Sequence, residues 1–274
     1  MTAIASRFAG VLVTYSPALA AHAIPRFARL MAALDEKAIL LVVNNHPTSQ
    51  NKTFPSMVNL KGTNRWMEFG GWQEALDAAR RIAGPDGLES VVFANDTFCA
   101  HRPMGAFEEF AFRQAVRKMM KHSGASAAGQ ISRTETPFEL DGVSMSEWIC
   151  TYLFALNKRA LNAIDWKIHL PDGVPEKWLR GGHIAENFFG PELDAALTAH
   201  LRAWLFEPHK PSAWYQAESL TAANAEMFER KARSIIFEKH LSARLMAAGA
   251  RIFSSDVTPS ARIVRKAMRM LERL

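Results

Sequence analysis

Three short aliphatic runs constrain the fold of this chain more than any other feature of its sequence. They occupy residues 10–15, 38–43 and 91–94, they are rich in Val, Leu and Ile, and polar residues follow each of them. Continuous apolar runs of this length are typical of strands that are buried on both faces of a parallel sheet. We therefore predict a sheet in which these runs form the buried strands.

Helical segments alternate with these runs. Apolar residues recur there at spacings of three and four, which predicts amphipathic helices. The apolar faces comprise Trp72, Ala75, Leu76, Ala79 and Ile82 in one helix, Phe107, Phe110, Ala111 and Ala115 in a second, and Leu193, Ala196, Leu197, Leu201 and Trp204 in a third. The alternation predicts an α/β fold with a doubly wound, mostly parallel sheet flanked by helices, and a ligand crevice at the carboxyl ends of the strands.

The rest of the chain is less regular. Residues 130–141 show no clear period, a further strand is predicted near residues 148–156, and the chain becomes helical after Pro171. We expect one domain over residues 1–206 and a helical C-terminal extension over residues 207–274 that packs on it.

The composition of the chain indicates which classes of partner it can bind and in which cell compartment it is expected. The 274 residues carry a formal net charge of +6, which suits an anionic ligand or an acidic membrane surface and does not by itself indicate nucleic acid. The two cysteines, Cys99 and Cys150, form no C-x-x-C pattern, so we expect two thiols rather than a disulfide scaffold or a zinc site. We expect a cytoplasmic protein that spans no membrane and binds no nucleic acid.

Asn95-Asp96-Thr97 directly follows the third aliphatic run. A carboxylate at the carboxyl end of a buried strand is held firmly and still faces the crevice, where it can hold a divalent cation against a diphosphate. These residue types are also common in turns and helix caps, so a structural role is the alternative.

Three segments resemble a known family in the family's order. Residues 63–76, TNRWMEFGGWQEAL, resemble the N-x-G-x-D-F-G-x-W-x-x-x-L signature of rhamnan synthesis protein F-like glycosyltransferases, which are family 2-like enzymes of GT-A fold. Asn95-Asp96-Thr97 resembles their Asn-Asp-Ser, and residues 186–197, ENFFGPELDAAL, are similar to the F-F-G-x-E-D-x-D-L acceptor element. The resemblance covers about residues 10 to 205 and implies a GT-A-like nucleotide-sugar-binding and acceptor domain.

The resemblance implies a donor site and a metal. Asp96 is the expected ligand of a divalent metal, Mn²⁺ or Mg²⁺. Gly70 and Gly71 are expected to stand ahead of a helix, where backbone amides can approach a phosphate; packing of that helix is the alternative. The expected donor-contacting residues are Thr14, Tyr15, Asn44, Asn64, Glu68, Gly70, Gly71, Asn95 and Asp96.

The acceptor element supplies the candidate general base. An inverting transfer needs a carboxylate that takes the proton of the acceptor hydroxyl, and Glu192 is the first candidate, with Asp194 as substitute. Pro191-Glu192 also fits the start of a helix, which is the alternative interpretation.

The resemblance implies a glycosyltransferase that moves a sugar, with inversion, from a nucleotide-sugar donor to a surface polysaccharide or to a related glycan or lipid-linked glycan. A non-catalytic GT-A-like module that binds a glycan or a partner is the alternative, because Arg65 and Trp66 replace the glycine step and Leu193 replaces an acid. The chain has no G-x-G-x-x-G after its first strand and no phosphate-binding P-loop motif, which disfavours unrelated nucleotide-binding enzymes.

The last segment, residues 258–274, has the pattern of a basic amphipathic helix. Thr258 and Pro259 fit its start, and five basic residues lie opposite an apolar stripe, namely Arg262, Arg265, Lys266, Arg269 and Arg273. A helix packed on the domain is one interpretation. The other is a helix that rests on an anionic inner membrane surface.

Overall fold

The computed structural model describes residues 8–47, 57–84, 87–100, 104–170, 172–206 and 219–256. The strands are β1 (Phe8–Thr14), β2 (Ile39–Asn44), β3 (Val58–Lys61), β4 (Arg65–Trp66), β5 (Ser90–Asn95), β6 (Ser126–Leu140), β7 (Val143–Asn157) and β8 (Arg251–Ser254). The helices are α1 (Pro17–Ala32), α2 (Met67–Ala83), α3 (Ala106–Lys121), α4 (Lys158–Ala163), α5 (Ala195–Phe206), α6 (Ala225–Ala247) and the short 3₁₀ helix η1 (Ala185–Asn187).

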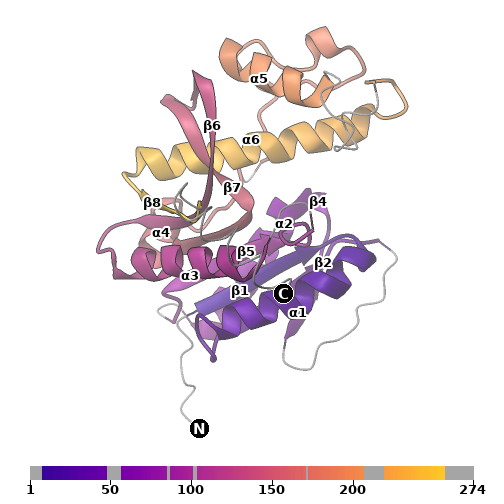
Figure 1. Cartoon of the computed structure of the whole chain (residues 1–274). Helices are drawn as coiled ribbons and strands as arrows, with labels where there is room; N and C mark the ends of the chain where they lie inside the picture. The colour runs from indigo at the N-terminus through magenta and orange to yellow at the C-terminus, as the bar shows by residue number, and fades with distance from the viewer. Residues whose placement is uncertain are drawn as a thin grey trace, which may run out of the picture.

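A seven-stranded mixed sheet, with strand order β3-β2-β1-β5-β7-β6-β8, forms the centre of the molecule (Figure 1). The pairs β3–β2, β2–β1, β1–β5 and β6–β8 are parallel, whereas β7 runs antiparallel to both β5 and β6. The predicted α/β class with helices flanking a sheet is therefore confirmed, and the sheet is mixed because one long hairpin joins its parallel half.

The parallel half contains the three predicted strands as β1, β2 and β5. The chain moves from β1 to β2 and β3 on one side and then returns to place β5 on the other side of β1. Strand order therefore reverses between β1 and β5. In open α/β sheets, ligands bind in the crevice outside the carboxyl ends of the strands at such a reversal.

The β6–β7 hairpin differs from the sequence expectation. Residues 130–141 were expected to be irregular, but most of them belong to the strand β6. Asp141 and Gly142 form the turn with φ of 54° and 75°, and an Asp-Gly pair is a strong signal for this kind of hairpin. The C-terminal part, expected to be helical, adds β8 to the sheet as well as α6.

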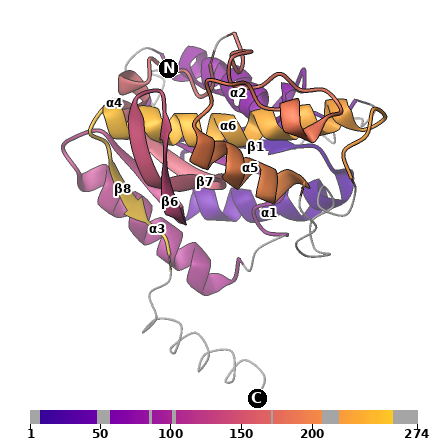
Figure 2. The same cartoon turned by 90° about the horizontal axis from the view of Figure 1, so that it is seen from above.

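Each face of the sheet has its own core. Helices α1 and α3 cover one face, and α2 and α6 cover the other, as Figure 2 shows. The helix faces were predicted in part: Trp72 and Leu76 are fully buried in α2, whereas Ile82 is 52% exposed and Phe110 of α3 is 49% exposed. Ile82 lies in the last turn of α2, and Phe110 lies outside the buried side of α3, which consists of Phe112, Ala115, Val116 and Met119.

An ion pair within α6 contacts β7 through both of its side chains. Lys239 Nζ lies 3.2 Å from Glu238 Oε1 and 3.6 Å from the centre of the Trp148 ring. Glu238 Oε2 accepts hydrogen bonds from the amide and the hydroxyl of Thr151. Burial lowers the pKa of Lys239, and the Glu238 carboxylate opposes that shift.

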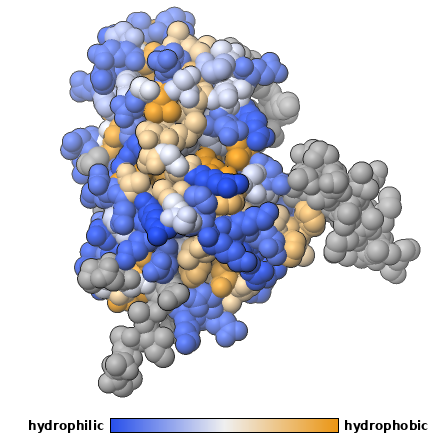
Figure 3. Space-filling view, turned by 90° about the vertical axis from the view of Figure 1, so that its left-hand side faces the viewer, coloured by the Kyte–Doolittle hydropathy of each residue, from blue (hydrophilic) through white to orange (hydrophobic). Residues whose placement is uncertain are grey.

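The outer surface is largely polar. On the side that carries β8 and α4, apolar residues gather in a central band between hydrophilic areas (Figure 3). None of the described helices is both long enough and apolar enough to cross a membrane. Cys99 and Cys150 are both free thiols, as predicted.

Candidate functional site

The reversal point brings together polar residues from three neighbouring strands. Thr14 at the end of β1 pairs with Asn44 at the end of β2, and Val13 pairs with Asn95 at the end of β5. Thr14 is buried, and its hydroxyl donates to Val43 O at 3.3 Å. Four of the predicted donor-contacting positions, Thr14, Asn44, Asn95 and Asp96, therefore lie along one edge of the sheet.

Asp96 links the ends of β5 and β1. Its amide continues the ladder by donating to Val13 O at 2.9 Å. Its carboxylate atom Oδ2 accepts from the amides of Tyr15 and Ser16, both at 2.8 Å. Ser16 is the N-cap of α1, so the carboxylate fixes the loop between β1 and α1. Asp96 thus has the structural role that the sequence left open, and the other oxygen, Oδ1, has no hydrogen-bond partner among the described residues.

The environment of Asp96 favours its protonated form. The residue is only 5% exposed, and burial raises the pKa of its carboxyl above the ordinary value. The two amide hydrogen bonds oppose that shift, and the negative charge of Glu68 adds to it. A cation that approaches Asp96 would therefore lower the pKa of its carboxyl, because a positive charge favours the ionised form.

Glu68 reaches the same edge from α2. Its Oε1 accepts from Ser234 Oγ of α6 at 2.8 Å, which joins α2 to α6 above the strand ends. The helix begins at Met67 rather than near Trp72, so Glu68 lies in its first turn and not ahead of it.

The two glycines also lie inside α2, which corrects their expected place ahead of the helix. A Cβ atom on Gly71 would lie 2.8 Å from Val13 Cγ2, so the absence of a side chain allows α2 to pack closely on β1. At Gly70 the nearest atom, Trp66 Cβ, would be 3.4 Å away. Helix–sheet packing explains Gly71, and a contact of either glycine with a donor stays a prediction.

Asn64, Tyr15 and Asn95 complete the predicted donor set. Asn64 has φ of 53°, and its carbonyl accepts from Arg230 of α6 at 3.2 Å. Tyr15 is 53% exposed, and its ring centre lies 5.7 Å from that of His46. The Asn95 side chain forms a turn by accepting from the amide and the hydroxyl of Thr97.

The two candidate bases do not join this edge. Figure 1 shows α6 between α5 and the parallel strands, and both residues directly precede α5. Glu192 is exposed and its Oε2 lies 3.3 Å from Lys177 Nζ. Asp194 Oδ1 accepts from the Leu197 amide at 2.9 Å, so Asp194, and not Glu192, caps the helix. No described contact joins either residue to Asp96, and their role as base stays a prediction.

A metal at Asp96 would need ligands from outside the protein. Among the residues that the structure describes, no group of three or more His, Cys, Asp or Glu could hold a metal ion. Asp96 Oδ1 can offer one oxygen, and Mg²⁺ is often held by one or two carboxylates together with substrate phosphates and water. The residues present therefore fit a metal that arrives with a phosphorylated ligand.

Three residues at this edge were not predicted. Ser16 could have been found, because Ser16-Pro17 is a recognisable helix start. Asn45 is buried, and its Oδ1 has no hydrogen-bond partner in the described part of the chain. Arg230 has no local signal at all, because its contact with Asn64 joins positions that are 166 residues apart.

Comparisons with known proteins identify no family. No family model matches the chain, and no curated protein matches it. Among solved structures, the chain is similar to the mannosyltransferase PcManGT from Pyrobaculum calidifontis, solved in complex with GDP-Man and Mn²⁺. That similarity has a TM-score of 0.35 and 15% sequence identity, and it covers 99% of this chain and 82% of the other. The function is accordingly argued from the residues of this chain.

Proposed function

We propose that this protein is a glycosyltransferase that moves a hexosyl or deoxyhexosyl group from a nucleotide sugar to a glycan acceptor. The observation that carries the proposal is the position of Asp96 at the reversal between β1 and β5, beside the exposed Tyr15. That position is where open α/β sheets bind nucleotides. The resemblance of residues 63–76, 95–97 and 186–197 to family 2-like glycosyltransferases supports the same reaction.

In this proposal, different residues of the edge bind different parts of the donor. The Tyr15 ring is exposed beside the strand ends and suits stacking with a base, and Asp96 Oδ1 faces the diphosphate or the sugar. A divalent metal bound there would neutralise the charge that grows on the leaving diphosphate. The Asp96 Oδ2 atom meanwhile keeps the loop of Tyr15 and Ser16 in place, which fixes the donor site before the ligand arrives.

Glu192 remains the proposed base for an inverting transfer to a surface polysaccharide or a lipid-linked glycan. Its carboxylate is exposed and lies 3.3 Å from Lys177 Nζ, so an acceptor hydroxyl can approach it from the solvent. Asp194 is the weaker candidate because its Oδ1 caps α5. A base at Glu192 requires the acceptor to reach the donor across α6.

A non-catalytic module that binds a glycan or a partner is the second candidate. The lack of any described contact between Glu192 and the Asp96 edge favours it, because a base has to reach the acceptor that the donor site serves.

Thermal unfolding with a panel of nucleoside diphosphates and nucleotide sugars tests the proposal. One nucleotide should stabilise the protein, with or without Mn²⁺, by about 2.7 kcal/mol at 100 times its dissociation constant. The stabilising nucleotide sugar then serves in a transfer assay. Glu192→Gln should bind the donor as wild type does but transfer about 100-fold more slowly, whereas the exposed Glu176→Gln should not change the rate.

If no nucleotide or nucleotide sugar of the panel stabilises the protein, the transferase is excluded and the non-catalytic binding module is the remaining candidate. Equal loss of donor affinity and transfer rate in Glu192→Gln would instead remove Glu192 from the role of base.

A further inference from the structure

Three arginines from two elements meet around the turn that precedes α2. The guanidinium carbon of Arg65 lies 4.9 Å from the centre of the Trp66 ring, and that of Arg233 lies 5.1 Å from it. Arg230, one turn before Ser234 on α6, donates to Asn64 O at 3.2 Å. The aromatic ring and the carbonyl hold these side chains in place, so little of their freedom remains to be lost when a ligand binds.

The cluster carries more positive than negative charge. Glu229 pairs with Arg233 at 2.7 Å, and Glu68 is engaged by the hydroxyl of Ser234. Within the described ranges, neither Arg65 nor Arg230 has a carboxylate partner, and the buried Nε of Arg233 has no hydrogen-bond acceptor. Arg65 and Arg230 therefore keep donors in the fork geometry that phosphate oxygens match, whereas Arg233 adds charge beside them while it is paired with Glu229.

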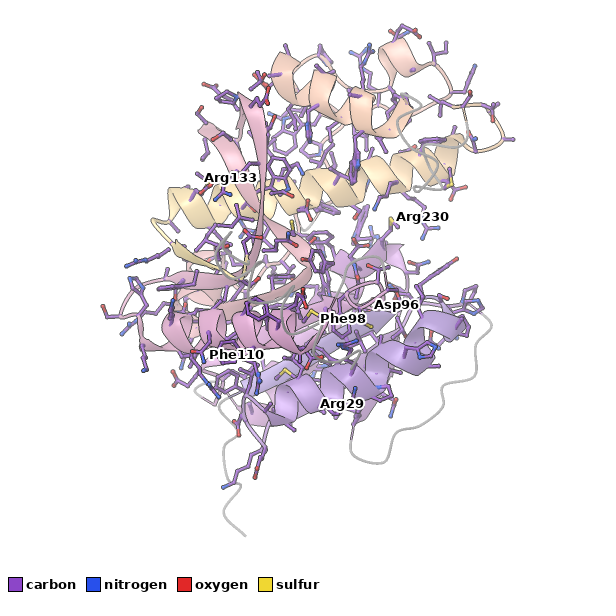
Figure 4. All side chains as sticks on the ribbon, viewed as in Figure 1. Arg29, Asp96, Phe98, Phe110, Arg133 and Arg230 are labelled. Carbon is purple, nitrogen blue, oxygen red and sulfur yellow. The ribbon has the colours of Figure 1, made fainter. Side chains whose placement is uncertain are left out.

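The cluster belongs to the same edge as Asp96. Ser234 contacts Glu68, whose charge acts on Asp96, and Ser234 lies one turn along α6 from Arg230. Figure 4 shows Arg230 on the side of α6 that faces the part of the molecule holding Asp96. The arginines are therefore linked to the Asp96 edge through α6 and Glu68.

We infer that Arg65, Arg230 and Arg233 form an anion site that binds the diphosphate of the donor directly and needs no metal for this contact. The inference rests on the proposed function, because the diphosphate is that of the nucleotide sugar. The cluster would neutralise the leaving group as its bond to the sugar breaks, in the way that Arg and Lys clamps stabilise charge at other phosphate sites.

Isothermal titration with inorganic pyrophosphate in the presence of EDTA tests the anion site without any nucleotide. Wild type should bind pyrophosphate, and Arg230→Gln and Arg65→Gln should each bind at least about tenfold more weakly, the usual effect of losing a charge-assisted hydrogen bond. The control is Arg80→Gln, because the Arg80 guanidinium stacks on Trp166 at 4.5 Å but lies in the last turn of α2. It should bind as wild type does.

The inference is overturned if wild type fails to bind pyrophosphate in EDTA, or if Arg230→Gln and Arg65→Gln bind it as tightly as Arg80→Gln. Thermal unfolding of each variant confirms that it is folded. The same titrations with the stabilising nucleoside diphosphate distinguish a failure of the anion site from a failure of the transferase proposal. If both arginine variants bind the nucleotide as tightly as wild type does, the inference is overturned and the transferase proposal is unaffected. If pyrophosphate binding depends on the arginines but no nucleotide binds, the anion bound at this site is not the diphosphate of a nucleotide-sugar donor.

Discussion

The two oxygens of the Asp96 carboxylate differ in their hydrogen bonds. Oδ2 holds the β1–α1 loop through the amides of Tyr15 and Ser16, and Oδ1 is free of hydrogen bonds from the described residues. A side chain that is fixed in this way presents a ligand atom in a defined direction, which a mobile surface carboxylate would not do.

The raised pKa of Asp96 gives a pH dependence with a definite sign. The folded protein binds the Asp96 proton more tightly than the unfolded chain does, so this group's contribution to the free energy of unfolding falls as pH rises from the ordinary value, 3.8, through the folded pKa. Asp96→Asn removes that contribution. Urea unfolding of both proteins, from that pH to neutrality, should show the advantage of wild type over Asp96→Asn shrinking as pH rises. An advantage that grows with pH contradicts the prediction.

Residue-level prediction from sequence succeeded where position along the chain decides the outcome. Asn95-Asp96-Thr97 directly follows a buried strand, so its place at the strand end followed from the pattern. Pro191-Glu192 was placed at a helix start, but Asp194 caps α5, because which acid caps the helix depends on the first residue of α5 and sequence patterns leave helix ends uncertain by a few residues.

At the scale of elements, β1, β2 and β5 were predicted within two residues because full burial requires an uninterrupted apolar run. The fourth strand of the parallel half, β3, is only partly buried and was not predicted. Helix α6 lies in the C-terminal extension that was expected to be helical, but its bounds were not predicted because its buried face contains polar side chains, namely Ser234, Lys239, His240 and Ser242. Strand β6 escaped prediction because half of it leaves the sheet as a two-stranded ribbon with exposed charges such as Arg133 and Glu139.

The packing of α2 on β1 predicts opposite effects for two neighbouring glycines. Gly71→Ala should destabilise the protein by about 1–3 kcal/mol, because its Cβ would overlap Val13 at 2.8 Å. Gly70→Ala should be neutral or should stabilise by up to about 1 kcal/mol, because alanine favours the helix and the site has room. Chemical unfolding of the two variants beside wild type measures both. Equal destabilisation by both would contradict the packing explanation.

The ion pair of Glu238 and Lys239 in α6 gives a further prediction. Glu238→Gln leaves Lys239 buried without its counter-charge and should destabilise by about 3–5 kcal/mol. The double variant Glu238→Gln with Lys239→Met should recover most of that loss, since methionine fills a similar space without a charge. A double-mutant cycle from urea unfolding checks this. A double variant as unstable as the sum of the single variants would show that the two side chains act independently.

At the scale of the whole molecule, the topological rule for open α/β sheets was enough to predict where the candidate site lies. The rule concerns strand ends, so it located Thr14 and Asp96 but not the part of the site that α6 contributes. The contact between Arg230 and Asn64 depends on how α6 crosses the sheet, and no local pattern contains that information.

The predicted basic helix, residues 258–274, lies outside the described residues, and its attachment to an anionic membrane stays a prediction. Each basic residue near such a surface contributes about 1 kcal/mol, so the full chain should sediment with anionic vesicles at low salt and be released at high salt. A chain ending at Asp256 keeps β8 and should remain in the supernatant. Equal sedimentation of the two chains would mean that the segment is not the anchor.

The place of β8 has a consequence for how the protein is made. Its partner strand β6 is synthesised long before it, and β8 pairs with residues 126–129 at the outer edge of the sheet. Until the ribosome has released the C-terminal part, that edge presents unpaired backbone groups to other chains. Synthesis therefore passes through a stage that is prone to association, and chaperones that shield open strands would act at that stage.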